Sequence, residues 1–129
     1  MTEQHYRGMI AHDWMEKGDA ALKAGERLLK ENLLVGCVNR LYYAAFYAVS
    51  AVLASEGKTY GRHSAVRASV HRDYVKSGRI PPECGKTFDR LFDDRQQGDY
   101  TPKTSFTDEE LQDLLVRTRA FIECFRSML

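Results

Sequence analysis

The chain has 129 residues, of which 43% are hydrophobic and 29% are charged, and its formal net charge is +1. This length suits one domain, residues 1–129, built around a single hydrophobic core. The balance of residue types argues against disorder, collagen-like repetition and a membrane protein. A net charge so close to zero provides no general attraction to nucleic acid, so any such binding must come from a local patch.

The sequence indicates neither a membrane protein nor a secreted one. No apolar run approaches the ~18 residues of a spanning helix, and the N-terminus lacks the layout of a signal peptide. Cys37, Cys84 and Cys124 are odd in number and widely spaced, without a CxxC or Cys/His pairing. We therefore expect a soluble cytoplasmic protein with reduced, packed thiols, no zinc site and no membrane partner.

Apolar residues recur at helical spacing along most of the chain, and few stretches alternate as strands do. Gly18 and Gly25 lie near the apolar stripe of the first helix, where the absence of a side chain would let a neighbouring helix approach closely. The first four expected helices span roughly residues 9–30, 33–55, 61–76 and 82–96.

The last helix has the clearest start signal in the chain. Thr107 is its predicted N-cap, and Glu110 follows three residues later as a capping box requires. An apolar stripe continues from there to the C-terminus. The sequence therefore predicts an all-α fold, an antiparallel bundle of four principal helices with one interrupted between Gly78 and Pro82.

The second predicted helix is unusually aromatic. Tyr42, Tyr43, Phe46 and Tyr47 cover more of its circumference than one core-facing stripe needs. Such a helix is either central in its bundle or also buried against a second chain. The central position is favoured, and a homodimer interface is the alternative.

Most familiar catalytic patterns are absent from the sequence. It contains no glycine-rich phosphate loop, no GxSxG turn and no HExxH pair, and none of its four histidines follows a glutamate by three residues. We expect neither a catalytic metal nor another cofactor.

Three short motifs carry a family resemblance. Asn39-Arg-Leu-Tyr-Tyr-Ala-Ala-Phe-Tyr47, Gly57-Lys-Thr-Tyr-Gly-Arg-His63 and Arg95-Gln-Gln-Gly-Asp-Tyr100 occur in this order. The chain resembles the HEPN domain family and, within it, small single-domain proteins of the UPF0332 type. The resemblance implies a helical bundle, commonly homodimeric, from prokaryotic toxin–antitoxin modules that contain a minimal nucleotidyltransferase antitoxin. It also implies that catalytic relatives are metal-independent endoribonucleases with an Arg-x4-6-His motif.

The residues at the Arg-x4-6-His positions determine whether the chain can cleave RNA. In RNA cleavage a histidine can move protons near neutral pH, while an arginine neutralises the phosphorane. Arg95 fills the arginine position, but Tyr100 replaces the histidine, and a phenol of pKa near 10 is a poor base at pH 7. In the structural alternative, Arg95 pairs with Asp99 or a neighbouring acid and Tyr100 packs its ring under the last helix.

A literal Arg-x4-His match exists at Arg7 and His12. It lies at the start of the first helix instead of before the last one, and so loose a pattern arises easily by chance. We reject it as the catalytic pair.

The third predicted helix carries the strongest cationic cluster. His63, Arg67 and His71 are spaced by four and line one face, and Arg62 and Arg72 flank them. Such a face could hold RNA phosphates or a nucleotide, although a solvated helical face is the favoured interpretation. His63 also lies near the apolar stripe, where it is the one candidate for a substitute base.

Arg40 has two interpretations. It could form a second phosphate clamp facing Arg95 across a cleft, or it could pair with Asp93 or Asp94 as a structural bridge. Sequence spacing alone does not choose between them.

Two functions follow from the resemblance and these residues. In the first, the protein is the toxin-like component of a HEPN and nucleotidyltransferase module and cleaves or binds RNA or nucleotide through Arg95, with Tyr100, Arg40 and His63 in support. Asp99 is a further candidate for binding, and the Tyr100 substitution argues against ribonuclease activity. In the second, it is a non-catalytic dimeric interaction domain that binds a nucleotidyltransferase. The resemblance further implies a hypothesis of AMP transfer to Tyr100, which we expect in an accessible, loop-like segment.

Overall fold

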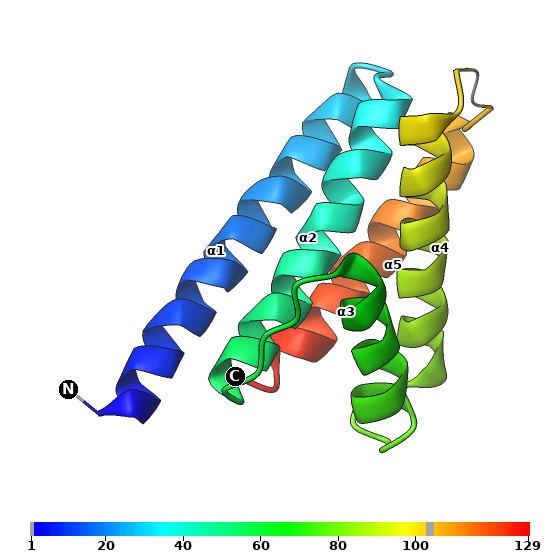
Figure 1. Cartoon of the computed structure of the whole chain (residues 1–129). Coiled ribbons are helices and arrows are strands. Elements are labelled where there is room, and N and C mark those ends of the chain that lie inside the picture. The colour runs from blue at the N-terminus through cyan, green and yellow to red at the C-terminus, as the bar shows by residue number, and fades with distance from the viewer. Residues whose placement is uncertain (1, 103–104) are drawn as a thin grey trace.

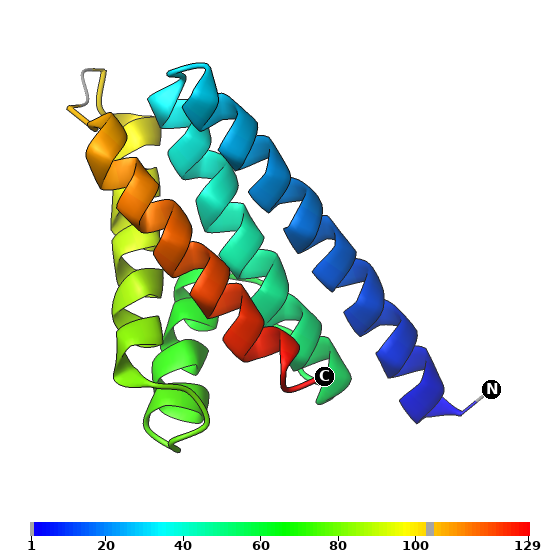
Figure 2. The ribbon, with the colours of Figure 1, turned by 180° about the vertical axis from the view of Figure 1, so that it is seen from behind.

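The computed structural model describes residues 2–102 and 105–129. These residues form an all-α antiparallel bundle and contain no β-strand (Figure 1; Figure 2, from behind), which confirms the predicted fold class. The helices are α1 (Glu3–Lys30), α2 (Leu34–Ser55), α3 (His63–Ser69), its π-helical continuation η1 (Val70–Val75), α4 (Pro82–Tyr100) and α5 (Asp108–Arg126).

Helix α2 occupies the centre of the bundle. Leu41, Tyr42, Ala44 and Ala45 are each 0% exposed, and such closely spaced helical residues point in different directions. Helices α1, α4 and α5 all pack against α2. The prediction that this aromatic helix is central is therefore confirmed.

Helix α2 also corrects the sequence analysis on one point. Its 22 residues include a window with mean hydropathy 1.2, long and apolar enough to cross a membrane, whereas we expected no such run. However, 61% of that window is buried inside the bundle. This burial is typical of the core helix of a water-soluble protein.

Glycines allow α1 to lie close against α2. A Cβ atom at Gly18 would lie 3.1 Å from the backbone carbonyl oxygen of Ala44, and one at Gly25 would lie 2.9 Å from a methyl carbon of Leu41. Both contacts are tighter than ordinary van der Waals packing. Both positions therefore serve the close approach predicted for them.

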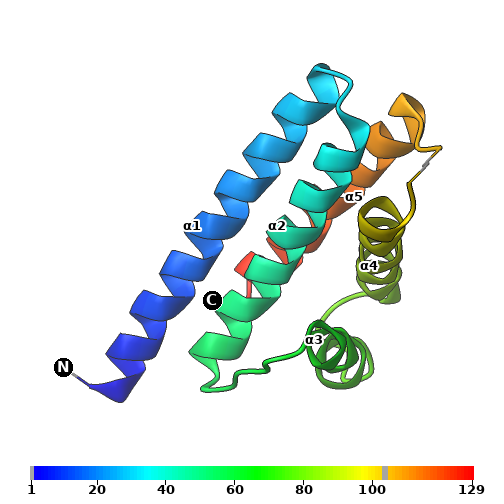
Figure 3. The same ribbon diagram turned by 45° about the horizontal axis from the view of Figure 1, so that its top comes forward.

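The chain reverses direction at the predicted interruption. Gly78 has φ +82°, in the left-handed region that glycine adopts readily, and α4 then begins at Pro82 and runs back beside α3 and η1 (Figure 3). Within η1, the buried Tyr74 donates a 2.9 Å hydrogen bond to Glu56, the residue that caps the end of α2. Glu56 also pairs with Arg79 at 2.6 Å. These contacts fix η1 against the end of α2.

Two helix boundaries were predicted from the sequence: the start of α5 and the end of α4. The N-cap at Thr107 is confirmed, because its Oγ1 accepts a 3.2 Å hydrogen bond from the amide of Glu110. In contrast, α4 continues to Tyr100, four residues beyond the expected end. Arg95 and the polar residues after it are thus helical, and the prediction of a loop-like segment is wrong.

Candidate functional site

Arg95 lies on α4 against two tyrosines of α2. Its side chain is 18% exposed, and one terminal amino group, Nη2, donates a 3.1 Å hydrogen bond to the hydroxyl of Tyr43. The guanidinium carbon is 5.3 Å from the ring centroids of both Tyr42 and Tyr43, within the range of a cation–π contact. The aromatic face of α2 therefore holds the positive charge of Arg95.

Asp99 forms an ion pair with Arg95 one turn along α4. The distance from Nε of Arg95 to the carboxylate is 3.0 Å, which confirms the predicted ion pair between these two residues. The Nε–H is nevertheless not directed at that carboxylate, and it has no hydrogen-bond partner among residues 2–102 and 105–129. This nitrogen is itself buried, so its N–H lies inside the described structure and is not exposed to a ligand.

His63, the first residue of α3, reaches the same pair of tyrosines. Its Nδ1 lies 2.8 Å from the hydroxyl of Tyr42, and its ring stacks on Phe46 with centroids 4.5 Å apart and an interplanar angle of 18°. Burial lowers the pKa of His63, and the positive charge of Arg95 lowers it further. The imidazole is therefore neutral at pH 7.

The hydrogen bond between Tyr42 and His63 defines which ring nitrogen carries the proton. Tyr42 is 0% exposed, and burial raises the pKa of its phenol. Within the described part of the chain, Nδ1 of His63 is the hydrogen-bond partner of this hydroxyl, and an undonated buried O–H costs about 1–3 kcal/mol. Tyr42 accordingly donates to Nδ1, which leaves the proton of the neutral ring on Nε2. His63 therefore presents a hydrogen-bond donor, whereas a general base would need an unprotonated nitrogen.

Arg40 lies in the same aromatic cluster, but it does not form the predicted ion pair with Asp93 or Asp94. Its guanidinium carbon is 5.2 Å from the ring centroid of Tyr43, and its Nε and Nη2 donate to the side-chain oxygen of Asn39 at 3.2 and 3.0 Å. The two acids considered as partners contact other arginines, Asp93 with Arg67 and Asp94 with Arg90. Arg40 and Arg95 thus both lie against Tyr43.

The rest of the cationic cluster separates from this site. Arg67 Nε and His71 Nε2 both contact one carboxylate oxygen of Asp89 on α4, at 2.9 and 2.8 Å. Burial of Asp89 raises its pKa, but the hydrogen bonds from His71 and Arg67 outweigh that effect and the net pKa is lowered. These two side chains are therefore not freely solvated, because Asp89 of α4 contacts both, and phosphate binding by them stays a prediction.

Arg62 and Arg72 lie on the surface, Arg62 exposed ahead of α3 and Arg72 paired with Asp73 at 3.0 Å. Tyr100 is 78% exposed at the end of α4. The proposed packing of its ring under the last helix is therefore wrong, although the expectation that it is accessible is right.

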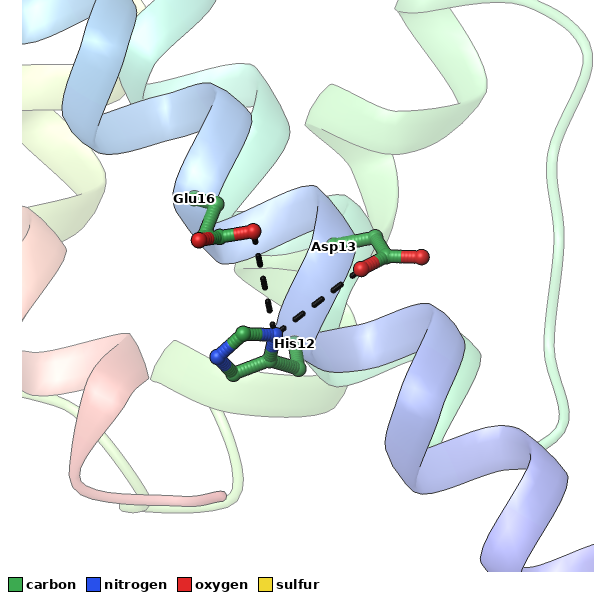
Figure 4. Close-up of side chains that lie close together, drawn as sticks. All are labelled: His12, Asp13 and Glu16. Atoms are coloured by element: carbon green, nitrogen blue, oxygen red, sulfur yellow. Dashed lines mark ion pairs between the residues drawn. The ribbon is translucent and has the colours of Figure 1, made fainter.

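The rejected Arg-x4-His match consists of two unconnected residues. Arg7 pairs with Glu3 at 2.7 Å. His12 is exposed and lies 3.8 Å from Asp13 and 3.9 Å from Glu16, all on one face of α1 (Figure 4). Each residue has its own local partners, which supports the rejection.

The sequence analysis did not predict the hydrogen-bonding roles of Tyr43 and Asp89. Tyr43 was recognised as part of an aromatic surface, but its hydroxyl as the acceptor for Arg95 was not. Asp89 was not considered at all. The available signal for Tyr43 is its place in the Asn39–Tyr47 motif, whereas no local pattern joins Asp89 to Arg67 and His71, which lie 22 and 18 residues before it.

Comparisons with known proteins agree with the fold. Residues 11–128 match the sequence profile described as "HEPN domain", so the chain belongs to the HEPN domain family. The chain is similar to a UPF0332 protein of Thermotoga maritima, with 34% identity over 93% of this chain and 91% of the relative. Two proteins of Methanocaldococcus jannaschii named "Putative toxin" are 27% and 24% identical, over 84% and 89% of this chain and 74% and 85% of their own lengths.

The lowered pKa of His63 predicts a pH dependence of stability. Because an unfolded histidine has a pKa near 6.5, the unfolded chain binds the proton more readily than the folded chain does. The stability contributed by neutral His63 is present above about pH 6.5 and is lost as the pH falls below it. We expect the Tm of the wild-type protein to drop between pH 7.5 and 5.5 by more than that of His63→Gln.

The exposed His12 provides the matched control for this measurement. His12→Gln should retain the wild-type pH dependence in the same thermal unfolding series. An equal drop in Tm for wild type and His63→Gln would show that the neutral state of His63 does not contribute to folding.

Proposed function

We propose that this protein is the toxin-like component of a prokaryotic HEPN and minimal nucleotidyltransferase module, and that it binds RNA or nucleotide phosphate at Arg95. One observation carries the proposal: the partly exposed guanidinium of Arg95 and the Nε2–H donor of His63 share one aromatic cluster around Tyr42. The names of the two Methanocaldococcus relatives support the toxin-like assignment.

The chemistry of the cluster suits a nucleic-acid strand. Guanidinium groups bind phosphate oxygens with charge-assisted hydrogen bonds, and Arg40 and Arg95 provide two such groups, 5.2 and 5.3 Å from the ring centroid of Tyr43. Aromatic side chains add stacking surfaces for bases, which tolerate different sequences. Phosphate contacts from the arginines and base contacts from the half-buried rings of α2 would together give modest, sequence-tolerant affinity.

The same geometry favours binding over cleavage. A metal-independent ribonuclease needs a group that removes the proton of the 2′-hydroxyl. His63 is neutral, but its Nδ1 accepts from Tyr42 and its Nε2 carries the proton. Tyr100 is a phenol at the exposed end of α4. Neither residue provides a base at pH 7, so we propose that the chain binds RNA without cleaving it.

Substitution of Arg95 tests this proposal. Arg95→Gln should weaken the binding of a fluorescein-labelled single-stranded RNA of mixed sequence by about tenfold or more, because a charge-assisted contact is worth roughly 1.5–3 kcal/mol. Arg95→Lys should recover part of the affinity. Fluorescence anisotropy in EDTA at low salt measures both, with thermal unfolding to verify folding.

Arg117 offers the matched control, since it pairs with Asp113 on the surface of α5. Arg117→Gln removes the same charge and should leave the affinity within about twofold. Equal losses for the two variants would mean that only net charge attracts the RNA, and no binding by the wild type would refute the proposal. If the labelled RNA is instead cleaved in EDTA, and Arg95→Gln or His63→Gln abolishes that cleavage, the site is catalytic.

The second function, a dimeric domain that binds a nucleotidyltransferase, is supported by the same face of α2. Tyr43, Phe46 and Tyr47 are only half-buried in the single chain, so a second copy or a partner could cover them. Tyr100, at 78% exposure, is accessible for AMP transfer by that partner. Co-expression with a neighbouring minimal nucleotidyltransferase, followed by light scattering and peptide mass spectrometry, would detect the dimer, the complex and the modified Tyr100.

A further inference from the structure

Two thiols from distant parts of the sequence meet where α4 and α5 pack together. Cys84 lies in the first turn of α4 and Cys124 near the end of α5. Their sulfur atoms are 3.4 Å apart. Sulfur atoms at this distance are in direct contact, and a disulfide bond of about 2.05 Å requires a further approach of little more than 1 Å.

The two cysteines differ in accessibility. Cys84 is 7% exposed, whereas Cys124 is only partly buried. Burial raises the pKa of Cys84 to about 12, and the contact with Cys124 and the charge of Glu83 act in the same direction. Cys124 is therefore the thiol that a reagent in solution reaches first, and the buried sulfur of Cys84 is in contact with it.

Neighbouring contacts already hold α4 and α5 in the required register. One turn after Cys84 on α4 and one turn before Cys124 on α5, Phe88 stacks on Phe121 with ring centroids 5.6 Å apart and an interplanar angle of 28°. Farther along α4, Arg90 pairs with Asp113 of α5 at 3.1 Å. A bond between the two sulfur atoms would thus join helices whose relative position is set independently of it.

We propose that Cys84 and Cys124 are a reversible oxidation site, which a hydroperoxide converts to an intramolecular disulfide. The sulfur of Cys124 attacks one peroxide oxygen, the O–O bond breaks, and Cys124 becomes a sulfenic acid as an alcohol or water leaves. The sulfur of Cys84 then attacks Cys124 and releases water, so that two thiols and one hydroperoxide give one disulfide, one alcohol or water, and one water. The sulfur atoms lose two electrons and the peroxide gains them.

This proposal is independent of the RNA-binding function, because neither cysteine contacts Arg95, Tyr43 or His63 in the described residues. The third thiol, Cys37, is 0% exposed in α2, and burial raises its pKa to about 11. We therefore expect Cys37 to stay reduced in the folded protein.

Mild oxidation of the folded full-length chain with hydrogen peroxide tests the proposal. Intact-mass spectrometry should show the loss of two hydrogen atoms, about 2 Da, and peptide mapping should find Cys84 joined to Cys124. Closing this loop should raise the Tm by roughly 5–10 °C, and dithiothreitol should reverse both changes. Cys37→Ala, which retains the two proposed partners, should behave like the wild type.

Cys124→Ser, at the more exposed position, separates a specific pair from general thiol oxidation. This variant should fold, gain no disulfide and show no rise in Tm with peroxide. The proposal is overturned if Cys124 of the wild type proceeds to sulfinic acid while Cys84 remains a free thiol. Disulfide-linked dimers as the main product, or a link between Cys37 and either partner, would overturn it as well.

Discussion

The hydroxyl group of Tyr42 is a polar atom inside the most apolar helix of the bundle, and the arrangement of the site depends on it. Tyr42 is 0% exposed, so its O–H must be satisfied internally. His63 provides the acceptor at 2.8 Å, which fixes the start of α3 over α2 and orients the imidazole. The face of the Tyr42 ring lies against Arg95. One core residue therefore positions a histidine from α3 and an arginine from α4 in the same cluster.

The two groups of basic residues differ in their contacts with carboxylates. Arg95 has a single close carboxylate, Asp99, and that contact leaves Nε–H without an aligned acceptor among the described residues. In the neighbouring cluster, by contrast, Arg67 and His71 share Asp89 and are locally neutralised. Two groups of basic residues that look equivalent in sequence thus differ in the charge each can offer to a ligand.

Helical periodicity was sufficient to predict the all-α fold, the central position of α2 and the N-cap at Thr107, because these depend on local spacing and burial. It failed at the end of α4, where Gln-Gln-Gly-Asp has the composition of a loop. Gly98 there lies close to Val35 of α2, since an added Cβ would be 3.3 Å from its Cγ1, and Arg95 pairs with Asp99 across one turn. These tertiary and side-chain contacts outweigh the weak helix propensity of the segment. The contacts of His63 with Tyr42 and of Arg95 with Tyr43 join residues 21 and 52 positions apart, so no local pattern could reveal them.

The central claim is that His63 is a neutral hydrogen-bond donor beside Arg95, with Nδ1 occupied by Tyr42. The most direct measurement is the pair of imidazole ¹⁵N chemical shifts of His63 at pH 7, assigned with His63→Gln. The account predicts an unprotonated, hydrogen-bonded Nδ1 and a protonated Nε2, and the Tyr42→Phe variant should remove the hydrogen-bond effect at Nδ1. A proton on Nδ1 with a bare Nε2 would contradict the account, because His63 would then present a base to the site.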